Sequence, residues 1–284
     1  MKRQFRIGDF CFCLDGGESL PAPENFARFA DARGEAQYVY RLREADGLPA
    51  PQGTLIARRA DLAVFAAPEG ECRLLGVKGA GAFYALYRET GGREAEVLVL
   101  GQAREFLGLD TVFVSLLALE RRMIARDSLI LHCAFTEYRG RAILFSALSG
   151  TGKSTQAALW ERYRGSRTLN GDRALLRRAG GVWTACGWPV CGSSEICETG
   201  EVPIGAIVML RQGKENRAER LAPARAFSLL YAQVTVNQWN PAFIRQAMAL
   251  LEALIAQTPV VQLTCDMTEG AVRCLEALLF RREA

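Results

Sequence analysis

Residues 147–155 read Ala147-Leu148-Ser149-Gly150-Thr151-Gly152-Lys153-Ser154-Thr155. This stretch fits the spacing of a phosphate-binding loop, G-x-x-x-x-G-K-[ST], with alanine at the first position. Its glycines permit turns that aim successive backbone N–H groups at phosphate oxygens, the Lys153 ammonium reaches the outer phosphates, and the Ser154 hydroxyl can ligate Mg²⁺. An apolar strand is expected before the loop and a helix to about residue 164 after it, the order of elements that binds phosphate. The sequence therefore predicts a nucleotide site at residues 149–155.

The pattern on either side of this loop divides the chain into two regions. Up to about residue 108 we expect short strands separated by turns, at residues 5–7, 10–13, 38–40, 62–65, 83–87 and 97–100. A helix of about sixteen residues is expected to begin at Asp110, because apolar residues recur there at helical spacing. We therefore expect a β-rich region with a connecting helix over residues 1–127 and an α/β catalytic domain over residues 128–284.

Within residues 128–284 the sequence predicts strands and helices in alternation. Strands are expected at residues 129–135, 142–146, 168–172, 174–178, 182–186, 204–210 and 260–265. Pro223 and Pro241 mark two helix starts, and a last amphipathic helix is expected to begin at Thr268-Glu269.

Composition limits the chemistry that the chain can perform. Half of its 284 residues are apolar, and 35 basic residues against 31 acidic ones leave a net charge of only +4 without a basic block. We therefore expect no nucleic-acid partner and no membrane partner. Four of the basic residues are lysines, and His132 is the single histidine, which excludes a multi-histidine metal site. The sequence does not determine the oligomeric state, and a homo-oligomer is one of the alternatives.

The cysteines and the N-terminal residues predict a cytoplasmic location. The chain has nine cysteines, an odd number, and no Cys-x-x-Cys pair, so we expect reduced thiols that behave as small buried hydrophobic groups. The first residues contain no apolar core followed by a small-residue cleavage site, and no apolar run approaches the length that spans a bilayer.

Two residues near the loop are candidates for the chemistry itself. Asp172 follows the predicted strand after the loop helix, where it could bind Mg²⁺, act as a general base or do both; a turn aspartate is the structural alternative. His132 lies in an apolar strand, where a lone histidine is more often a core residue. Glu195 is a weaker candidate for Mg²⁺ or substrate, since a solvated loop explains it equally well. Arg211 and Arg220 could hold phosphate or an acidic substrate, but a solvated surface explains these arginines better.

The stretch from His132 to Ser154 resembles, without a gap, the catalytic-domain signature of the HPr kinase/phosphorylase family. The histidine, a Tyr138/Gly140 turn and the loop lysine stand at the family's spacing, with His132 21 residues before Lys153. The family then has a pair of aspartates, of which this chain keeps Asp172 but has Gly171 in place of the other. The resemblance covers roughly residues 128–230 and weakens after its first third, and the region before it differs from the family's N-terminal domain.

The resemblance implies a P-loop kinase domain of the HPr kinase/phosphoenolpyruvate carboxykinase type. On this interpretation the catalytic residues are Asp172 as the base, His132 and Lys153, while Ser154 and Asp172 hold Mg²⁺ and residues Ser149 to Thr155 hold ATP. The expected reaction transfers the γ-phosphoryl group to a serine-type hydroxyl of a peptide or protein, and a precursor peptide is one such acceptor. The single aspartate leaves open whether a reverse, phosphorolytic reaction exists.

Two alternatives remain at this point. The same loop could serve a kinase that phosphorylates a small-molecule hydroxyl. The chain could also be a non-catalytic, ATP-sensing module whose β-rich region binds a partner, and the missing second carboxylate keeps that alternative open.

Overall fold

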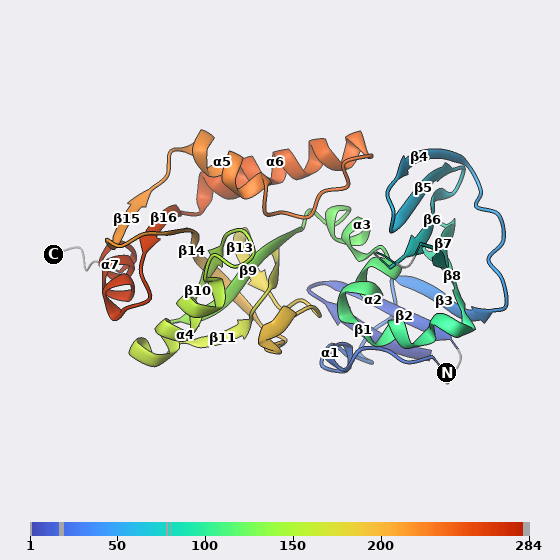
Figure 1. The fold of residues 1–284 in the computed structure, drawn as a ribbon, viewed down its shortest axis with the longest axis horizontal. Helices are drawn as coiled ribbons and strands as arrows, with labels where there is room; N and C mark the ends of the chain where they lie inside the picture. The colour runs from blue at the N-terminus through green and yellow to red at the C-terminus, as the bar shows by residue number, and fades with distance from the viewer. Residues whose placement is uncertain (1, 17–19, 78, 80, 281–284) are drawn as a thin grey trace. The chain divides into compact units, whose positions relative to one another are not determined.

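Two β-sheets form the framework of the chain, one in each of two units, Met1–Leu119 and Glu120–Ala284 (Figure 1). The structure is a computed structural model that describes residues 2–16, 20–77, 79 and 81–280. Both sheets carry helices, so the chain is a mixed α/β protein. No helix within the described ranges combines the length and apolar character that a membrane crossing requires.

The sheet of the first unit has the strand order β1-β2-β3-β8-β7-β6-β5-β4. Its strands are β1 (Lys2–Ile7), β2 (Phe10–Gly16), β3 (Tyr38–Ala45), β4 (Thr54–Arg58), β5 (Leu62–Ala67), β6 (Gly70–Gly76), β7 (Phe83–Gly91) and β8 (Glu94–Leu100). The β2/β3 and β3/β8 pairs are parallel and the other pairs are antiparallel. All six strands that the sequence predicts here are present, whereas β4 and β6 were not predicted.

Aromatic side chains form much of the core of this unit. The unit also contains α1 (Glu24–Ala27), a 3₁₀-helix (Gly101–Gly108) and α2 (Asp110–Leu116). Phe26 of α1 packs edge-on against Phe113 of α2, with ring centroids 4.8 Å apart, and against Phe5 of β1 at 5.9 Å. All three rings are buried, which places the two helices over the β1 end of the sheet.

The helix expected over about sixteen residues from Asp110 is broken, so that prediction is wrong. It divides into α2 and α3 (Leu119–Ile124), because Ala118 adopts a left-handed backbone conformation with φ of 48°. The hydrogen bond from Ala118 N–H to the Ser115 carbonyl shows that the last turn of α2 tightens before the break. The border between the two units follows Leu119, one residue after the break.

In the second unit, five strands pair in a closed ring, in the order β10-β9-β12-β13-β14 and back to β10. The strands of this unit are β9 (Leu129–Tyr138), β10 (Arg141–Ser146), β11 (Arg167–Asn170), β12 (Arg173–Ala179), β13 (Val182–Cys186), β14 (Glu201–Gln212), β15 (Arg217–Arg220) and β16 (Val260–Cys265). β16 extends the sheet beside β14 in parallel, β15 follows β16, and β11 pairs with β9 beyond the end of β12.

Helices cover both faces of this sheet (Figure 1). They are α4 (Lys153–Arg164), α5 (Pro223–Tyr231), α6 (Pro241–Gln257) and α7 (Glu269–Leu279), with a short 3₁₀-helix at Gly192–Ser194. Side chains of successive strand residues point to opposite faces. Thus Leu131 and Cys133 of β9 belong to the core under α5 and α6, whereas Ala134 belongs to the core under α4 and α7. The helix starts predicted at Pro223, Pro241 and Thr268-Glu269 are all present.

Candidate active site

The phosphate-loop motif lies between the end of β10 and the start of α4, as its sequence context predicts. Gly150 and Gly152 have φ of 79° and 110°, which favours glycine at both positions. Gly152 is the N-cap of α4 and makes no side-chain capping hydrogen bond, so the first backbone N–H groups of the helix are left for another partner. A helix N-terminus of this kind attracts anions.

The loop lysine is held inside the loop rather than in solvent. Lys153 is 8% exposed, and its Nζ donates a hydrogen bond of 3.2 Å to the carbonyl of Ala147 at the start of the loop. Burial lowers the pKa of Lys153, although the charge of Asp172 acts in the opposite direction. A buried lysine whose ammonium donates to a neutral carbonyl is suited to bind an anion that enters the loop.

Strand register brings the other two predicted catalytic residues together. Arg173, the first residue of β12, pairs with His132 of β9, and the Cys133 N–H of β9 donates to the Asp172 carbonyl. His132 Nε2 lies 3.4 Å from one Asp172 carboxylate oxygen, and both side chains are about three-quarters buried. The Ser146 hydroxyl, at the end of β10, donates to the His132 carbonyl at 2.8 Å, which ties this pair to the strand that leads into the loop.

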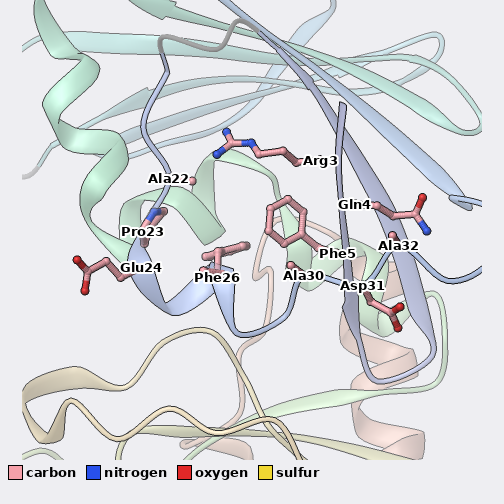
Figure 2. A pocket seen from close by; sticks show the side chains of 11 residues that line it. Arg3, Gln4, Phe5, Ala22, Pro23, Glu24, Phe26, Ala30, Asp31 and Ala32 are labelled. Carbon is pink, nitrogen blue, oxygen red and sulfur yellow. The ribbon is translucent and has the colours of Figure 1, made fainter. Parts of the chain in front are cut away.

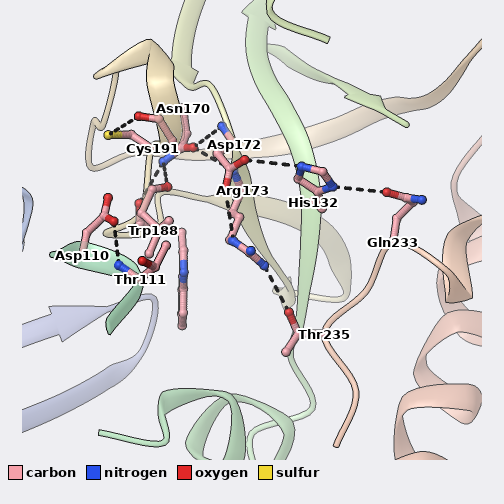
Figure 3. A network of polar contacts seen from close by, with 12 residues as sticks. Asp110, Thr111, His132, Asn170, Asp172, Arg173, Trp188, Cys191, Gln233 and Thr235 are labelled. Atoms are coloured by element: carbon pink, nitrogen blue, oxygen red, sulfur yellow. Dashed lines mark hydrogen bonds and ion pairs between the residues drawn. The ribbon is translucent and has the colours of Figure 1, made fainter. Parts of the chain in front are cut away.

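Asp172 is surrounded by positive charge (Figure 3). Its second carboxylate oxygen lies 3.2 Å from Arg173 Nε, and Arg173 Nη1 also contacts the Thr235 hydroxyl at 3.4 Å. Burial raises the pKa of Asp172, but the hydrogen bond from His132 and the charges of Arg173, His132 and Lys153 outweigh it, so that the pKa lies below its ordinary value. Asp172 is therefore an anion at neutral pH.

Gln233 is the second partner of His132. Its Oε1 lies 3.2 Å from His132 Nδ1, on the side of the ring away from Asp172 (Figure 3). An imidazolium would donate to both neighbours, whereas a neutral ring satisfies both only when the Gln233 amide is turned to donate to Nδ1. In either case the ring has little rotational freedom, because it is held from both sides.

The turn that carries Asp172 is fixed by a buried asparagine. Asn170 is fully buried, and its Oδ1 accepts hydrogen bonds of 2.8 Å from the N–H groups of both Asp172 and Arg173. Its Nδ2 donates to the carbonyls of Trp188 and Val190, so that the turn is anchored to the segment after β13 (Figure 3). Asp172 is thus held by an Asx-type turn whose amide has all its partners.

The structure gives a physical reason for glycine at position 171. A Cβ placed on Gly171 would overlap with the Cβ and Oγ atoms of Ser194. Ser194 is itself fixed, because its hydroxyl donates to the Cys191 carbonyl at 2.7 Å. An aspartate at position 171 does not fit beside this serine, so the site has one carboxylate at this turn and not two.

The weaker candidates are distributed around the site. Glu195 is exposed at the end of the Gly192–Ser194 turn and, within the described residues, makes no hydrogen bond or ion pair. Arg220 is exposed on β15, and Arg211 lies near the end of β14, where it lines a cavity beside the phosphate loop. Sequence reasoning did not single out Arg173, Asn170 or Gln233, since nothing in the sequence reveals which polar side chains lie beside His132 and Asp172.

The expected Mg²⁺ site consists of the Ser154 hydroxyl and the Asp172 carboxylate. No cluster of three or more His, Cys, Asp or Glu side chains suited to a metal occurs in residues 2–16, 20–77, 79 and 81–280. This donor set nevertheless fits Mg²⁺, which commonly uses one or two protein oxygens and takes its other ligands from phosphates and water. The nine cysteines are free thiols, and burial raises the pKa of Cys133 behind the loop, so that it is a neutral thiol there.

A separate cavity of about 670 Å³ lies in the first unit (Figure 2). Phe5 and Phe26 form part of its lining, together with Asp31. The Asp31 carboxylate is bound by Arg6 at 2.7 Å and by Arg33 at 2.9 Å, which holds its pKa well below the ordinary value. A cavity whose carboxylate is already bound by two arginines offers no catalytic arrangement comparable to that of the second unit.

Comparisons with known proteins leave this site to be interpreted from its own geometry. No protein-family model matches the chain, and no curated protein matches its sequence. Among solved structures 41 chains match. One of them is the Hpr(Ser) kinase/phosphatase from Coxiella burnetii, with a TM-score of 0.32 and 9% identity over 52% of this chain and 87% of that chain. A similarity this low does not establish a common fold, and the resemblance to the HPr kinase/phosphorylase family therefore stays a prediction.

Proposed function

We propose that this protein is a kinase that transfers the γ-phosphoryl group of ATP to a serine-type hydroxyl of a peptide or protein. The observation that carries the proposal is the juxtaposition, in one unit, of a phosphate loop with a buried lysine and an ionised Asp172 paired with His132. Phosphoryl transfer requires little more than alignment of the reacting groups and stabilisation of charge on the phosphates, and these residues provide both.

Each residue has a defined role in this proposal. Backbone N–H groups of Ser149 to Thr155 bind the phosphates, and the Lys153 ammonium neutralises charge on the outer ones. Ser154 and Asp172 would hold Mg²⁺, which would add further charge neutralisation when bound. Asp172 orients the acceptor hydroxyl and receives its proton, while His132 and Arg173 hold the carboxylate in place at 3.4 Å and 3.2 Å.

Asp172 suits this role as an orienting group more than as a strong base. A carboxylate with a lowered pKa is a weak base at neutral pH, so it accepts the proton only as the new oxygen–phosphorus bond forms. This timing fits phosphoryl transfer, in which the nucleophile is still largely protonated when the bond to the leaving group has weakened.

Nucleotide binding tests the first half of the proposal. We expect Mg·ATP to bind wild-type protein and to bind Lys153→Ala at least about tenfold more weakly, since one buried charge is lost. Lys214→Ala is the matched control, because Lys214 is an exposed lysine of the same unit that lies outside the loop. Equal affinity of wild type and Lys153→Ala would remove the basis for any ATP-dependent function.

Transfer of label from γ-labelled ATP tests the second half and separates the alternatives. A kinase labels a serine peptide, a small-molecule kinase labels only a free hydroxyl compound, and an ATP sensor labels neither although ATP binds. Wild type is compared with Asp172→Asn, and Asp46→Asn, at an exposed position of the first unit, is the control. If ATP binds and no acceptor, peptide or small molecule, receives label, the proposal of a kinase is wrong and the sensor interpretation takes its place.

A further inference from the structure

A cavity of about 380 Å³ lies beside the phosphate loop, and the proposed function leaves it unassigned. We call it the loop-side cavity. Its lining includes Ala147, Leu148 and Thr151 of the loop, Arg211 of β14, Arg225 of α5, and Gln233 after α5. Its volume lies within the range of small-molecule and side-chain binding pockets.

Contacts at two lining residues, Ala147 and Gln233, indicate that the cavity lies near the part of the loop where the outer phosphates would bind. The Lys153 ammonium, the group that reaches the outer phosphates, is 3.2 Å from the carbonyl of Ala147, which lines the cavity. Gln233, on another wall, contacts His132, and His132 contacts Asp172. Ser154 and Thr155, at the far end of the motif, are not among the lining residues. The cavity therefore adjoins the position of the transferred group and suits the acceptor better than the nucleoside.

The charge of the lining restricts what this acceptor can be. Arg211 and Arg225 are both exposed, and within the part of the chain that the structure describes neither makes a hydrogen bond or an ion pair. The lining contains no aspartate or glutamate. Two guanidinium groups around a cavity otherwise lined by apolar, hydroxyl and amide side chains favour an acceptor with an anionic group, and arginine binds a carboxylate in a bidentate manner.

We propose that the loop-side cavity binds the acceptor, and that the acceptor carries a carboxylate close to its reactive hydroxyl. This inference rests on the proposed kinase function. In the reaction, the hydroxyl oxygen forms a bond to the γ-phosphorus while the bond from that phosphorus to the leaving oxygen of ADP breaks, and the hydroxyl proton passes to Asp172. Arg211 and Arg225 bind the neighbouring carboxylate and so position the hydroxyl. The carboxylate can belong to an acidic side chain of a peptide or to a free hydroxy amino acid.

Binding experiments with defined probes test this assignment independently of catalysis. The probes are a blocked peptide with one serine between two glutamates, the same peptide with both glutamates replaced by glutamine, and free L-serine. Each is titrated into the full chain in the presence of a saturating non-hydrolysable ATP analogue and Mg²⁺. The proteins are wild type, Arg211→Gln/Arg225→Gln, and Arg245→Gln, a control at an exposed arginine of α6 outside the cavity.

We expect wild type to prefer a carboxylate-bearing probe over the neutral peptide by about tenfold or more, and the double variant to lose most of this preference. Arg245→Gln should keep this preference. Binding of the acidic peptide identifies a side-chain carboxylate as the source, and binding of L-serine alone identifies a free amino acid. Equal binding of all three probes, no binding of any of them, or an unchanged preference in the double variant overturns the inference. A failure of the kinase proposal is recognised separately, in the label-transfer assay, where ATP would then bind and neither a peptide nor a small molecule would receive label.

Discussion

Asp172 is the residue on which the account of the site depends, and its environment decides its charge. Burial alone would raise its pKa and favour the neutral acid, but His132, Arg173 and Lys153 reverse that effect. The same carboxylate is fixed through its backbone by Asn170. The site thus has an ionised group that is oriented before any ligand enters.

Replacing Arg173 with glutamine is expected to raise the pKa of Asp172. Arg173 contributes a nearby positive charge that lowers this pKa. Without that charge, the effect of burial, which raises the pKa, is offset less strongly. Carboxyl-carbon NMR titration of labelled aspartate measures the change. The acid side of the pH–activity profile should move to higher pH as well, because the ionised form of Asp172 is then lost earlier as pH falls. Arg178→Gln, at an exposed arginine of the same strand, should leave both unchanged.

Gly171 and Ser194 are expected to show strong coupling in a double-mutant cycle. A Cβ at position 171 overlaps with the Ser194 side chain, so Gly171→Ala should lower the free energy of unfolding by about 1–3 kcal/mol. In the Ser194→Gly background the same change should cost much less, because the overlapping atoms are gone. Urea unfolding of the four proteins measures the coupling. Additive effects would mean that Ser194 does not exclude a side chain at position 171.

At the scale of elements, α7 makes hydrogen bonds that hold α4, the helix after the phosphate loop, in position. Glu276 of α7 accepts a hydrogen bond of 2.6 Å from Arg164 at the end of α4, and one of 2.9 Å from the Tyr138 hydroxyl of β9. The Tyr138 and Trp160 rings lie edge to face at 5.2 Å in the same region. The position of α4, and with it that of Lys153, therefore depends on contacts far from the loop.

Glu276→Gln should lower the free energy of unfolding by about 1 kcal/mol at neutral pH. Burial raises the pKa of Glu276, but the hydrogen bonds from Arg164 and Tyr138 outweigh it and lower the pKa below the ordinary value of 4.5. A lowered pKa in the folded state stabilises above the unfolded-state value, and this contribution is lost as pH falls through the folded-state value. The difference between wild type and variant should therefore shrink below about pH 4.5. Denaturant unfolding at several pH values checks this, with Glu252→Gln as the exposed control; a difference that grows on acidification would contradict it.

The elements that sequence reasoning found and missed differ in where their side chains lie. Strands with buried apolar runs, such as β9 and β14, were predicted, whereas β4 and β15 are short, mostly exposed edge strands. β6 was missed because Glu71 and Arg73 occupy buried positions in it as an ion pair at 2.7 Å. The prediction of one helix from Asp110 was wrong at Ala118, which has a left-handed backbone conformation. Alanine favours helix, so the sequence does not indicate a break at this position.

The sequence predicted the parts of the site that lie within one continuous stretch of residues. It did not predict contacts between residues on strands that are distant in the sequence. The loop, its flanking strand and its helix follow from one continuous stretch of residues. The pairing of His132 with Asp172 depends on β9 lying beside β12, and the contact with Gln233 joins residues about one hundred positions apart. The family resemblance suggested the first pair, but no pattern in the chain indicated Gln233 or Arg173.

For the whole molecule, every residue assigned to the site lies in the second of the two units. Binding of Mg·ATP should therefore slow amide hydrogen exchange most at the loop and at the start of α4, and hardly at all within residues 2–116. Mass-spectrometric exchange with and without nucleotide measures this distribution, and Lys153→Ala should abolish the protection. Protection centred on the first unit would place the nucleotide elsewhere.

A single-turnover experiment tests the central claim most directly. γ-Labelled ATP is bound to excess wild-type or Asp172→Asn protein, the serine peptide with two flanking glutamates is added, and transfer of label is followed over time. With Mg·ATP fully bound by both proteins, we predict that Asp172→Asn transfers the label at least about 100-fold more slowly, because orientation of the hydroxyl and acceptance of its proton are lost. Transfer at the same rate by both proteins would contradict the assignment of Asp172 and with it the account of this site.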